Sequence, residues 1–295
     1  MPSKAFSGVY PILAMPFDDD GRIDPETLQS EVEYLIAAGV DGLGIALASE
    51  IPMLTEAERD LALRTVVAQV RGRAKVVMNT GAAGTDLAIH HSRRAEELGA
   101  DALMVLPPPP GAATTSETIA YYGGIAGAVN VPIFIQDIAT SPVPPSLALQ
   151  IANTHEHVWY VKVEAPPTPP RVAEAVQRAE GRLTVFGGAG GAFLIEELRR
   201  GSRGTMPGST IPEVFVRTWR LFEAGQVDEA EAAFAPYASL IRLLGQGTGI
   251  SFYLCKEVLR LRGVFKSTRV RRPAAEPDEL AYRELRHQLE LLNLA

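Results

Sequence analysis

Short runs rich in valine, isoleucine and leucine alternate with longer amphipathic segments along the first 225 residues. The short runs predict buried strands, and apolar positions spaced three and four residues apart predict helices. The predicted strands are 8–14, 41–46, 75–79, 101–106, 131–136, 158–163, 183–186 and 204–207. The predicted helices between them are 25–38, 56–71, 85–98, 116–129, 145–153, 170–178, 192–200 and 212–224.

The junctions between these elements repeat. Ala-Ala-Gly-Val-Asp-Gly-Leu at 37–43 and Glu-Leu-Gly-Ala-Asp-Ala-Leu at 97–103 describe the same passage from a helix through glycine into a strand. About eight such units predict an α/β fold of the (β/α)₈ TIM barrel type. A doubly wound sheet is the alternative, but no glycine-rich fingerprint follows the first strand at Ala14.

After Gly225 the pattern becomes purely helical, with predicted helices at 227–244, 248–262 and 277–292. We therefore expect a barrel domain over residues 1–225. Residues 226–295 are expected to form C-terminal helices that pack on the barrel rather than an independent domain.

Composition limits the classes of partner. The formal net charge is 28 − 35 = −7 and the pI is about 5.4. An acidic excess argues against nucleic-acid and membrane partners, and no stretch is apolar enough to span a bilayer. The arginine-rich piece 266–272 is interpreted as a solvated linker. The N-terminus lacks an apolar signal core, so a cytoplasmic location is expected.

Cysteine and histidine are sparse. Cys255 is the only cysteine, so an internal disulfide is impossible, and it is interpreted as a core residue. The five histidines show no metal-ligand spacing, and no cofactor or metal is implied.

Lys162 is the strongest candidate for chemistry. It lies in the run Val-Trp-Tyr-Val-Lys-Val-Glu (158–164), which otherwise predicts a buried strand. Burying an ammonium is costly, and a buried amine that gives up its proton is a nucleophile toward carbonyls. The alternative is an ion pair with Glu164, which lies two positions on and on the same face of the strand.

Other polar residues follow the predicted strands. Catalytic residues of such barrels lie at the carboxyl ends of the strands. The residues at or just beyond these ends are Glu50 after the second strand, Asn79 and Thr80 at the third, Gln136 and Asp137 at the fifth, and Ser209 after the eighth. We expect them to converge with Lys162 on one mouth.

Nearly the whole chain resembles the dihydrodipicolinate synthase / N-acetylneuraminate lyase family of class I aldolases. The order and spacing of several short segments carry the resemblance. They are Gly-Val-Tyr-Pro-Ile-Leu-Ala-Met-Pro-Phe (8–17), Leu-Thr-Glu-Ala-Glu-Arg (54–59), Glu-Leu-Gly-Ala-Asp-Ala-Leu-Met-Val-Leu-Pro-Pro (97–108), Val-Pro-Ile-Phe-Ile-Gln-Asp (131–137), the Lys162 strand, Gly-Ser-Thr (208–210) and Lys-Glu (256–257).

The resemblance implies a Schiff base between Lys162 and the ketone of a 2-oxo acid. The resulting iminium would act as an electron sink for loss of a carbon fragment or of water. It also implies a homo-oligomer, a dimer or a tetramer. The small-molecule substrate would be pyruvate or a 2-keto-3-deoxy sugar acid.

Two motifs depart from the family pattern. The loop Ala-Leu-Ala-Ser-Glu (46–50) stands where the family has Gly-Thr-Thr-Gly-Glu, so we expect the Ala48 and Ser49 amides and the Ser49 hydroxyl to hold the carboxylate. Gln136 stands where the family has its catalytic tyrosine. Glutamine cannot transfer protons as a phenol does, and Glu164 is therefore the predicted acid/base.

These departures argue against dihydrodipicolinate synthase activity itself. Sialate cleavage is also disfavoured, because that lyase's Asp-Glu pair falls on Gly190-Gly191. Tyr10 could supply a phenol but is interpreted as core. Besides the loop, the residues expected to bind substrate are Glu50, Thr80, Gly188 and Ser209.

Three functions stay open from the sequence. The leading one is a Schiff-base lyase of the aldolase or dehydratase type. The second is a non-catalytic 2-oxo acid or sugar-acid binding relative that has lost its acid/base. The third is a phosphate-binding barrel enzyme, which rests only on the glycine-rich turn 187–191.

Overall fold

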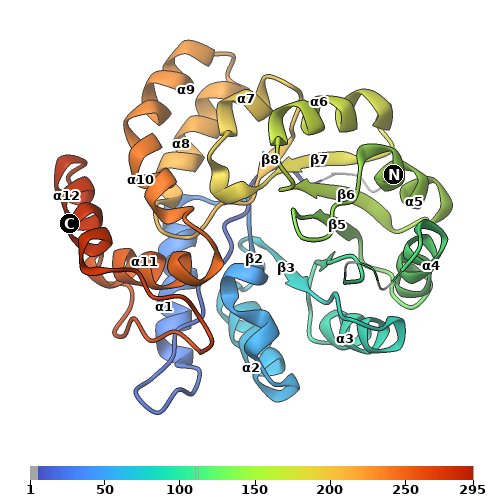
Figure 1. The fold of residues 1–295 in the computed structure, drawn as a ribbon, viewed down its shortest axis with the longest axis horizontal. Coiled ribbons are helices and arrows are strands. Elements are labelled where there is room, and N and C mark those ends of the chain that lie inside the picture. The colour runs from blue at the N-terminus through green and yellow to red at the C-terminus, as the bar shows by residue number, and fades with distance from the viewer. Residues whose placement is uncertain (1–5, 110, 112, 295) are drawn as a thin grey trace.

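The computed structural model describes residues 6–109, 111 and 113–294, and these contain eight parallel β-strands in the order β1-β8-β7-β6-β5-β4-β3-β2 (Figure 1). The strands are β1 (Gly8–Val9), β2 (Gly42–Ile45), β3 (Lys75–Asn79), β4 (Ala102–Val105), β5 (Ile133–Asp137), β6 (Val158–Val163), β7 (Thr184–Gly187) and β8 (Gly204–Thr205). A parallel bridge between Ile12 and Gly44 closes the ring between β1 and β2. The predicted (β/α)₈ barrel is confirmed.

Eight α-helices alternate with these strands among the described residues. They are α1 (Pro25–Ala38), α2 (Glu56–Val70), α3 (Thr85–Glu97), α4 (Thr115–Ala126), α5 (Pro145–Thr154), α6 (Thr168–Ala179), α7 (Leu194–Leu198) and α8 (Pro212–Glu223). The capping box of Thr55 and Glu58 starts α2, and Gly39 ends α1 in the left-handed conformation.

Aromatic side chains fill the inside of the barrel. Phe134 stacks on Tyr160 with ring centroids 4.3 Å apart, and Phe186 meets Tyr10 edge to face. Gly42 admits the Tyr10 ring, because a Cβ there would lie 2.1 Å from its Cε1. Tyr10 is therefore a core residue, as expected. Within the described residues these side chains form one buried cluster inside the barrel.

Two differences from the sequence prediction have local causes. The first strand is only two residues long because Pro11 has no N–H for the ladder, although Ile12 pairs again at bridges to Gly44 and Gly208. The predicted helix 227–244 is split into α9 (Val227–Phe234), a 3₁₀ turn (Ala235–Tyr237) and α10 (Ala238–Leu244). Pro236 lies in that turn, where it removes a helical hydrogen bond.

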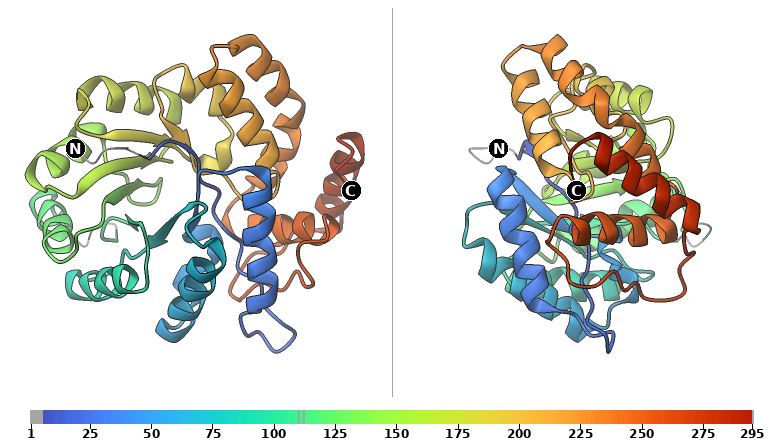
Figure 2. Two further views of the ribbon diagram at one scale, coloured as in Figure 1. Left: turned by 180° about the vertical axis from the view of Figure 1, so that it is seen from behind. Right: turned by 90° about the vertical axis from the view of Figure 1, so that its left-hand side faces the viewer.

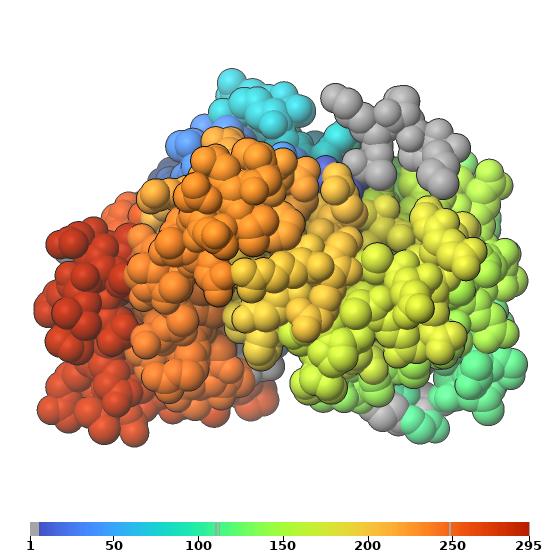
Figure 3. Space-filling model, turned by 90° about the horizontal axis from the view of Figure 1, so that it is seen from above, coloured from blue at the N-terminus to red at the C-terminus, as the bar shows by residue number. Residues whose placement is uncertain are grey.

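The C-terminal segment continues with α11 (Thr248–Leu261) and α12 (Glu279–Leu291). The left view in Figure 2 places α11, in orange, and α12, in red, together on one side of the barrel, and Figure 3 shows the orange and red segments side by side at one end of the molecule. The division at residue 225 stays a prediction. No described helix is long and apolar enough to cross a membrane.

Candidate active site

A cavity of about 550 Å³ opens at the carboxyl ends of the strands. Its lining comes from the barrel loops and also from α10 and α11. Five of the predicted site residues line it: Ala48, Gln136, Lys162, Glu164 and Ser209. The structure therefore brings together side chains that lie up to 161 positions apart, from Ala48 to Ser209.

Lys162 and Glu164 face this cavity together because alternate residues of a strand share a face. Lys162 Nζ lies 2.9 Å from Glu164 Oε1. The Lys162 side chain is 4% exposed and that of Glu164 is 20% exposed. The pair is thus shielded from bulk water on the lysine side and open to the cavity on the carboxylate side.

Two amides extend this contact into a chain of hydrogen bonds. Gln136 is the register partner of Lys162 on β5, and its Nε2 donates to Glu164 Oε2 at 2.7 Å. Asn79 Nδ2 donates to Gln136 Oε1 at 3.0 Å, which fixes the orientation of the Gln136 amide. Gln136 therefore holds the carboxylate of Glu164 rather than competing with it for the substrate.

The carboxyl end of β2 continues into a 3₁₀ turn (Leu47–Ser49) that borders the cavity. The Ser49 amide donates to Ala46 O at 2.9 Å. The Ser49 hydroxyl donates to Leu13 O at 2.5 Å and accepts from the Ala46 amide at 3.1 Å. Ser49 thus shapes the turn from behind. Leu47 and Ala48, at the start of the turn, line the cavity.

Glu50 lies behind the turn and does not line the cavity. It is completely buried, and its Oε1 accepts from Lys256 Nζ at 2.5 Å. Its Oε2 accepts from the Arg271 amide at 2.8 Å. Burial lowers the pKa of Lys256, and the neighbouring Glu50 opposes that shift. Both carboxylate oxygens of Glu50 are thus engaged within the protein, and Glu50 is not among the residues that line the cavity, so the structure gives no support to the predicted substrate contact.

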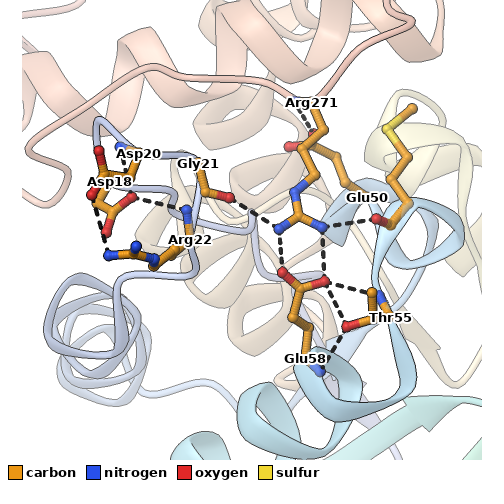
Figure 4. A network of polar contacts seen from close by, with 9 residues as sticks. Asp18, Asp20, Gly21, Arg22, Glu50, Thr55, Glu58 and Arg271 are labelled. Atoms are coloured by element: carbon orange, nitrogen blue, oxygen red, sulfur yellow. Dashed lines mark hydrogen bonds and ion pairs between the residues drawn. The ribbon is translucent and has the colours of Figure 1, made fainter.

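Arg271 corrects the interpretation of 266–272 as a solvated linker. Its guanidinium forms an ion pair with Glu58 and donates to Met53 O at 2.8 Å and Gly21 O at 3.0 Å (Figure 4). The Arg271 contact lowers the pKa of Glu58 to about 2. Lys266 and Arg272 are 66% and 75% exposed, as expected of a solvated segment. Arg271 departs from that expectation because its partner Glu58 lies 213 positions away, where no local pattern reveals it.

Thr80 and Gly188, both predicted to bind substrate, are not among the residues that line the cavity. Thr80 is fully buried and accepts from Ser92 Oγ at 2.8 Å, so it does not face the cavity. Gly188 lies directly against the reactive pair, since a Cβ there would come 2.2 Å from Glu164 Cγ and 3.0 Å from Lys162 Cε. Its lack of a side chain is what leaves room for Lys162 and Glu164.

Sequence reasoning missed Glu31 and Glu197. Burial raises the pKa of Glu31 to about 8 and that of Glu197 to about 7. Glu31 Oε1 accepts from the Ala14 amide at 2.9 Å, near Ser209. The signal was present, because Glu31 falls on the apolar stripe of α1 with Leu28 and Leu35.

Cys255 also lines the cavity, and burial raises its pKa to about 12, so its thiol is neutral. The Asp137 carboxylate lies elsewhere, paired with Arg171 at 2.7 Å. Within the described residues, no group of three or more His, Cys, Asp or Glu side chains is placed to hold a metal ion.

Comparison with known proteins places this site in a family. The model of the dihydrodipicolinate synthetase family matches residues 5–292. The chain belongs to the dihydrodipicolinate synthetase family. Among its relatives, L-2-keto-3-deoxyarabonate dehydratase of Azospirillum brasilense is 30% identical over 93% of this chain and 91% of the relative.

Other members are similar at the same level. The 4-hydroxy-tetrahydrodipicolinate synthase of Xanthomonas campestris is 29% identical over 77% of this chain and 76% of the relative. The crystal structure of dihydrodipicolinate synthase from Rhodopseudomonas palustris is 26% identical, with a TM-score of 0.89 over 97% of both chains.

Membership of this dihydrodipicolinate synthetase family confirms the leading interpretation of the sequence. The protein is a class I, Schiff-base-forming lyase of the aldolase or dehydratase type that acts on a 2-oxo acid. An enzyme is thereby favoured over the non-catalytic binding relative. The roles of individual residues stay predictions.

Proposed function

We propose that the protein is a dehydratase of 4-hydroxy-2-oxo acids, with Lys162 as the imine-forming residue and Glu164 as the acid/base. One observation carries this proposal. Among the described residues that line the cavity, Glu164 is the sole carboxylate and none is a tyrosine. The similarity to a 2-keto-3-deoxy acid dehydratase supports C–O rather than C–C cleavage.

The reaction begins with proton transfer inside the pair. Glu164 Oε1, 2.9 Å from Lys162 Nζ, takes a proton from the ammonium and leaves a neutral amine. The amine attacks the ketone carbon, and loss of water from that carbon gives the iminium. The proton on Glu164 supplies the acid that this dehydration needs.

Elimination follows on the same carboxyl group. Glu164 removes a proton from carbon 3, and the resulting enamine expels the hydroxyl of carbon 4. The protonated Glu164 returns its proton to that hydroxyl, so that water leaves. Hydrolysis of the imine regenerates Lys162 and releases an unsaturated 2-oxo acid. The net change is loss of one water molecule, and a hydroxyl on carbon 5 would let the product tautomerise to an aldehyde.

The substrate carboxylate is assigned to the turn after β2. The amides of Leu47 and Ala48 lie at the start of the 3₁₀ turn, where backbone N–H groups lack helical acceptors. Two N–H groups at such a start can bind an anion. The Glu50–Lys256 pair and Arg271 hold this turn from behind.

The test is product analysis of a 4-hydroxy-2-oxo acid incubated with the enzyme. Dehydration keeps the carbon skeleton intact and loses one water, whereas aldol cleavage releases pyruvate, which lactate dehydrogenase detects. Pyruvate released in step with substrate loss would refute the dehydratase proposal. Lys162→Ala is the matched inactive control.

We also propose that the chain assembles as a homo-oligomer, a dimer or a tetramer. Light scattering after size exclusion tests this directly. A mass equal to one chain at micromolar concentration would refute it.

A further inference from the structure

The cavity is larger than the reaction requires. The imine and the carboxylate turn engage only a three-carbon head group, but about 550 Å³ is typical of a pocket for a much larger ligand. The extra space extends to the C-terminal helices. Figure 1 shows α10 and α11 across the barrel mouth from β6, which carries Lys162.

The wall on that side is apolar. We define the distal wall as Ile211, Phe215, Ile241, Leu244 and Phe252, which come from the start of α8 and from α10 and α11. All five line the cavity, and all but Leu244 are buried.

Two polar side chains beside the distal wall make hydrogen bonds within the protein. The Ser251 hydroxyl donates to Leu244 O at 2.6 Å. Lys256 donates to Glu50 Oε1 at 2.5 Å and to Arg269 O at 2.6 Å. A polyhydroxylated tail would bury hydroxyls against the five apolar side chains of the distal wall, which cannot replace their hydrogen bonds to water, and this is unfavourable.

We propose that the distal wall selects 2-oxo acids whose tail beyond carbon 4 is a hydrocarbon. This inference rests on the proposed function, because Lys162 must hold the head group. It departs from the polyhydroxy acid named in the relative from Azospirillum brasilense. A hydrocarbon tail gains from each methylene that it buries against the wall.

Two series of probes test the inference on the full chain. The first contains 4-hydroxy-2-oxo acids with unbranched alkyl tails of increasing length. The second contains acids of matched length with a hydroxyl on every tail carbon. Each is assayed for kcat/KM of dehydration and for borohydride trapping on Lys162.

The expected result is a rise in kcat/KM of about fourfold per added methylene, which corresponds to about 0.8 kcal/mol for each buried methylene. The hydroxylated series is expected to stay at or below the shortest alkyl acid. A hydroxylated acid that matches or exceeds its alkyl counterpart would overturn the inference. Because this comparison uses the unaltered protein, it stands whatever the variants do.

Leu244 offers a variant in the distal wall, since it is partly exposed. Leu244→Asn should lower kcat/KM for the longest alkyl acid about tenfold, a loss of about 1.4 kcal/mol, and leave pyruvate trapping unchanged. Leu244→Met, which conserves volume, is the control and should change little. An equal loss for short and long acids would contradict the inference.

The two proposals fail in different ways. Absence of an adduct with every acid, in a folded protein, would defeat the proposed function and the inference together. Adducts with all acids but a preference for hydroxylated tails would defeat only the hydrocarbon preference.

Discussion

Glu164→Gln separates imine formation from elimination. Glutamine keeps the size and shape of the side chain but cannot carry a proton between carbon 3 and the hydroxyl of carbon 4. In the structure Glu164 Oε2 accepts a hydrogen bond from Gln136 Nε2 at 2.7 Å, and Glu164 Oε1 lies 2.9 Å from Lys162 Nζ. The variant therefore changes the chemistry at a position whose contacts are fully defined.

The surrounding amides can accommodate the change. The amide introduced by Glu164→Gln would present its oxygen to Lys162 and its nitrogen to Gln136. A flip of Gln136 and then of Asn79 restores each hydrogen bond, because Asn79 Oδ1 is a buried acceptor without a partner among the described residues. We therefore expect the variant to fold.

The expected magnitude follows from the lost proton transfer. General acid–base catalysis contributes about 10²- to 10⁴-fold, so kcat should fall by about that factor, or about 3 to 5 kcal/mol in activation free energy. Pyruvate should still be trapped on Lys162 at the end point, because a small 2-oxo acid can form the imine with water as the proton carrier.

Steady-state kinetics and intact mass after borohydride reduction measure both quantities on one preparation. Glu156→Gln, an exposed position before β6, is the matched control and should be active. Turnover of Glu164→Gln within about tenfold of the parent would refute the role of Glu164, since acid–base catalysis is worth more than that. Complete loss of trapping in a folded variant would refute the division of roles.

Three further predictions concern buried groups around the site. Burial raises the pKa of Glu31 from 4.5 to about 8, so the folded state holds a proton that the unfolded state has lost between these values. Stability should fall as pH rises through this window by up to about 1.4 kcal/mol per pH unit, and Glu31→Gln should remove that contribution in urea titrations; parallel curves would contradict it. Gly188→Ala should abolish trapping and turnover, because the new Cβ would come 2.2 Å from Glu164 Cγ. Adduct formation equal to that of the parent would contradict this prediction and show that the loop moves to accommodate the Cβ. Lys256→Met should cost about 3–5 kcal/mol by stranding buried Glu50, and adding Glu50→Gln should restore much of it in a double-mutant cycle; additive losses would argue against the pair.

The barrel could be predicted because each of its units leaves a local signal. Capping residues, terminal glycines and short apolar runs all lie within a few positions of the element that they define. The boundaries that shifted did so at prolines. Pro11 shortens the first ladder, and Pro236 splits a helix whose apolar pattern continues across it.

The reactive pair was predictable for the same reason. Lys162 and Glu164 are two positions apart on one strand, and strand alternation alone puts them on one face. Gln136 followed from the family resemblance, and the strand register places it beside Lys162.

The ion pairs that hold the turn after β2 in place could not be predicted from the sequence. Arg271 reaches Glu58 across 213 positions, and Lys256 reaches Glu50 across 206. No local pattern encodes such a contact, and a run of arginines suggests solvent when its partners are unknown. The apolar distal wall could not be predicted either. Its residues belong to three helices, and the apolar face of each is also what ordinary packing against the barrel requires.

Borohydride trapping tests the central claim most directly. The protein is incubated with pyruvate, reduced, digested and analysed by peptide mass, beside Lys162→Ala and the exposed-site control Lys266→Ala. We predict one reduced pyruvyl adduct on the peptide that contains Lys162, present in Lys266→Ala and absent in Lys162→Ala. An adduct on another lysine, or none with any 2-oxo acid in a folded protein, would contradict Schiff-base chemistry at Lys162 and leave its contact with Glu164 as a structural ion pair.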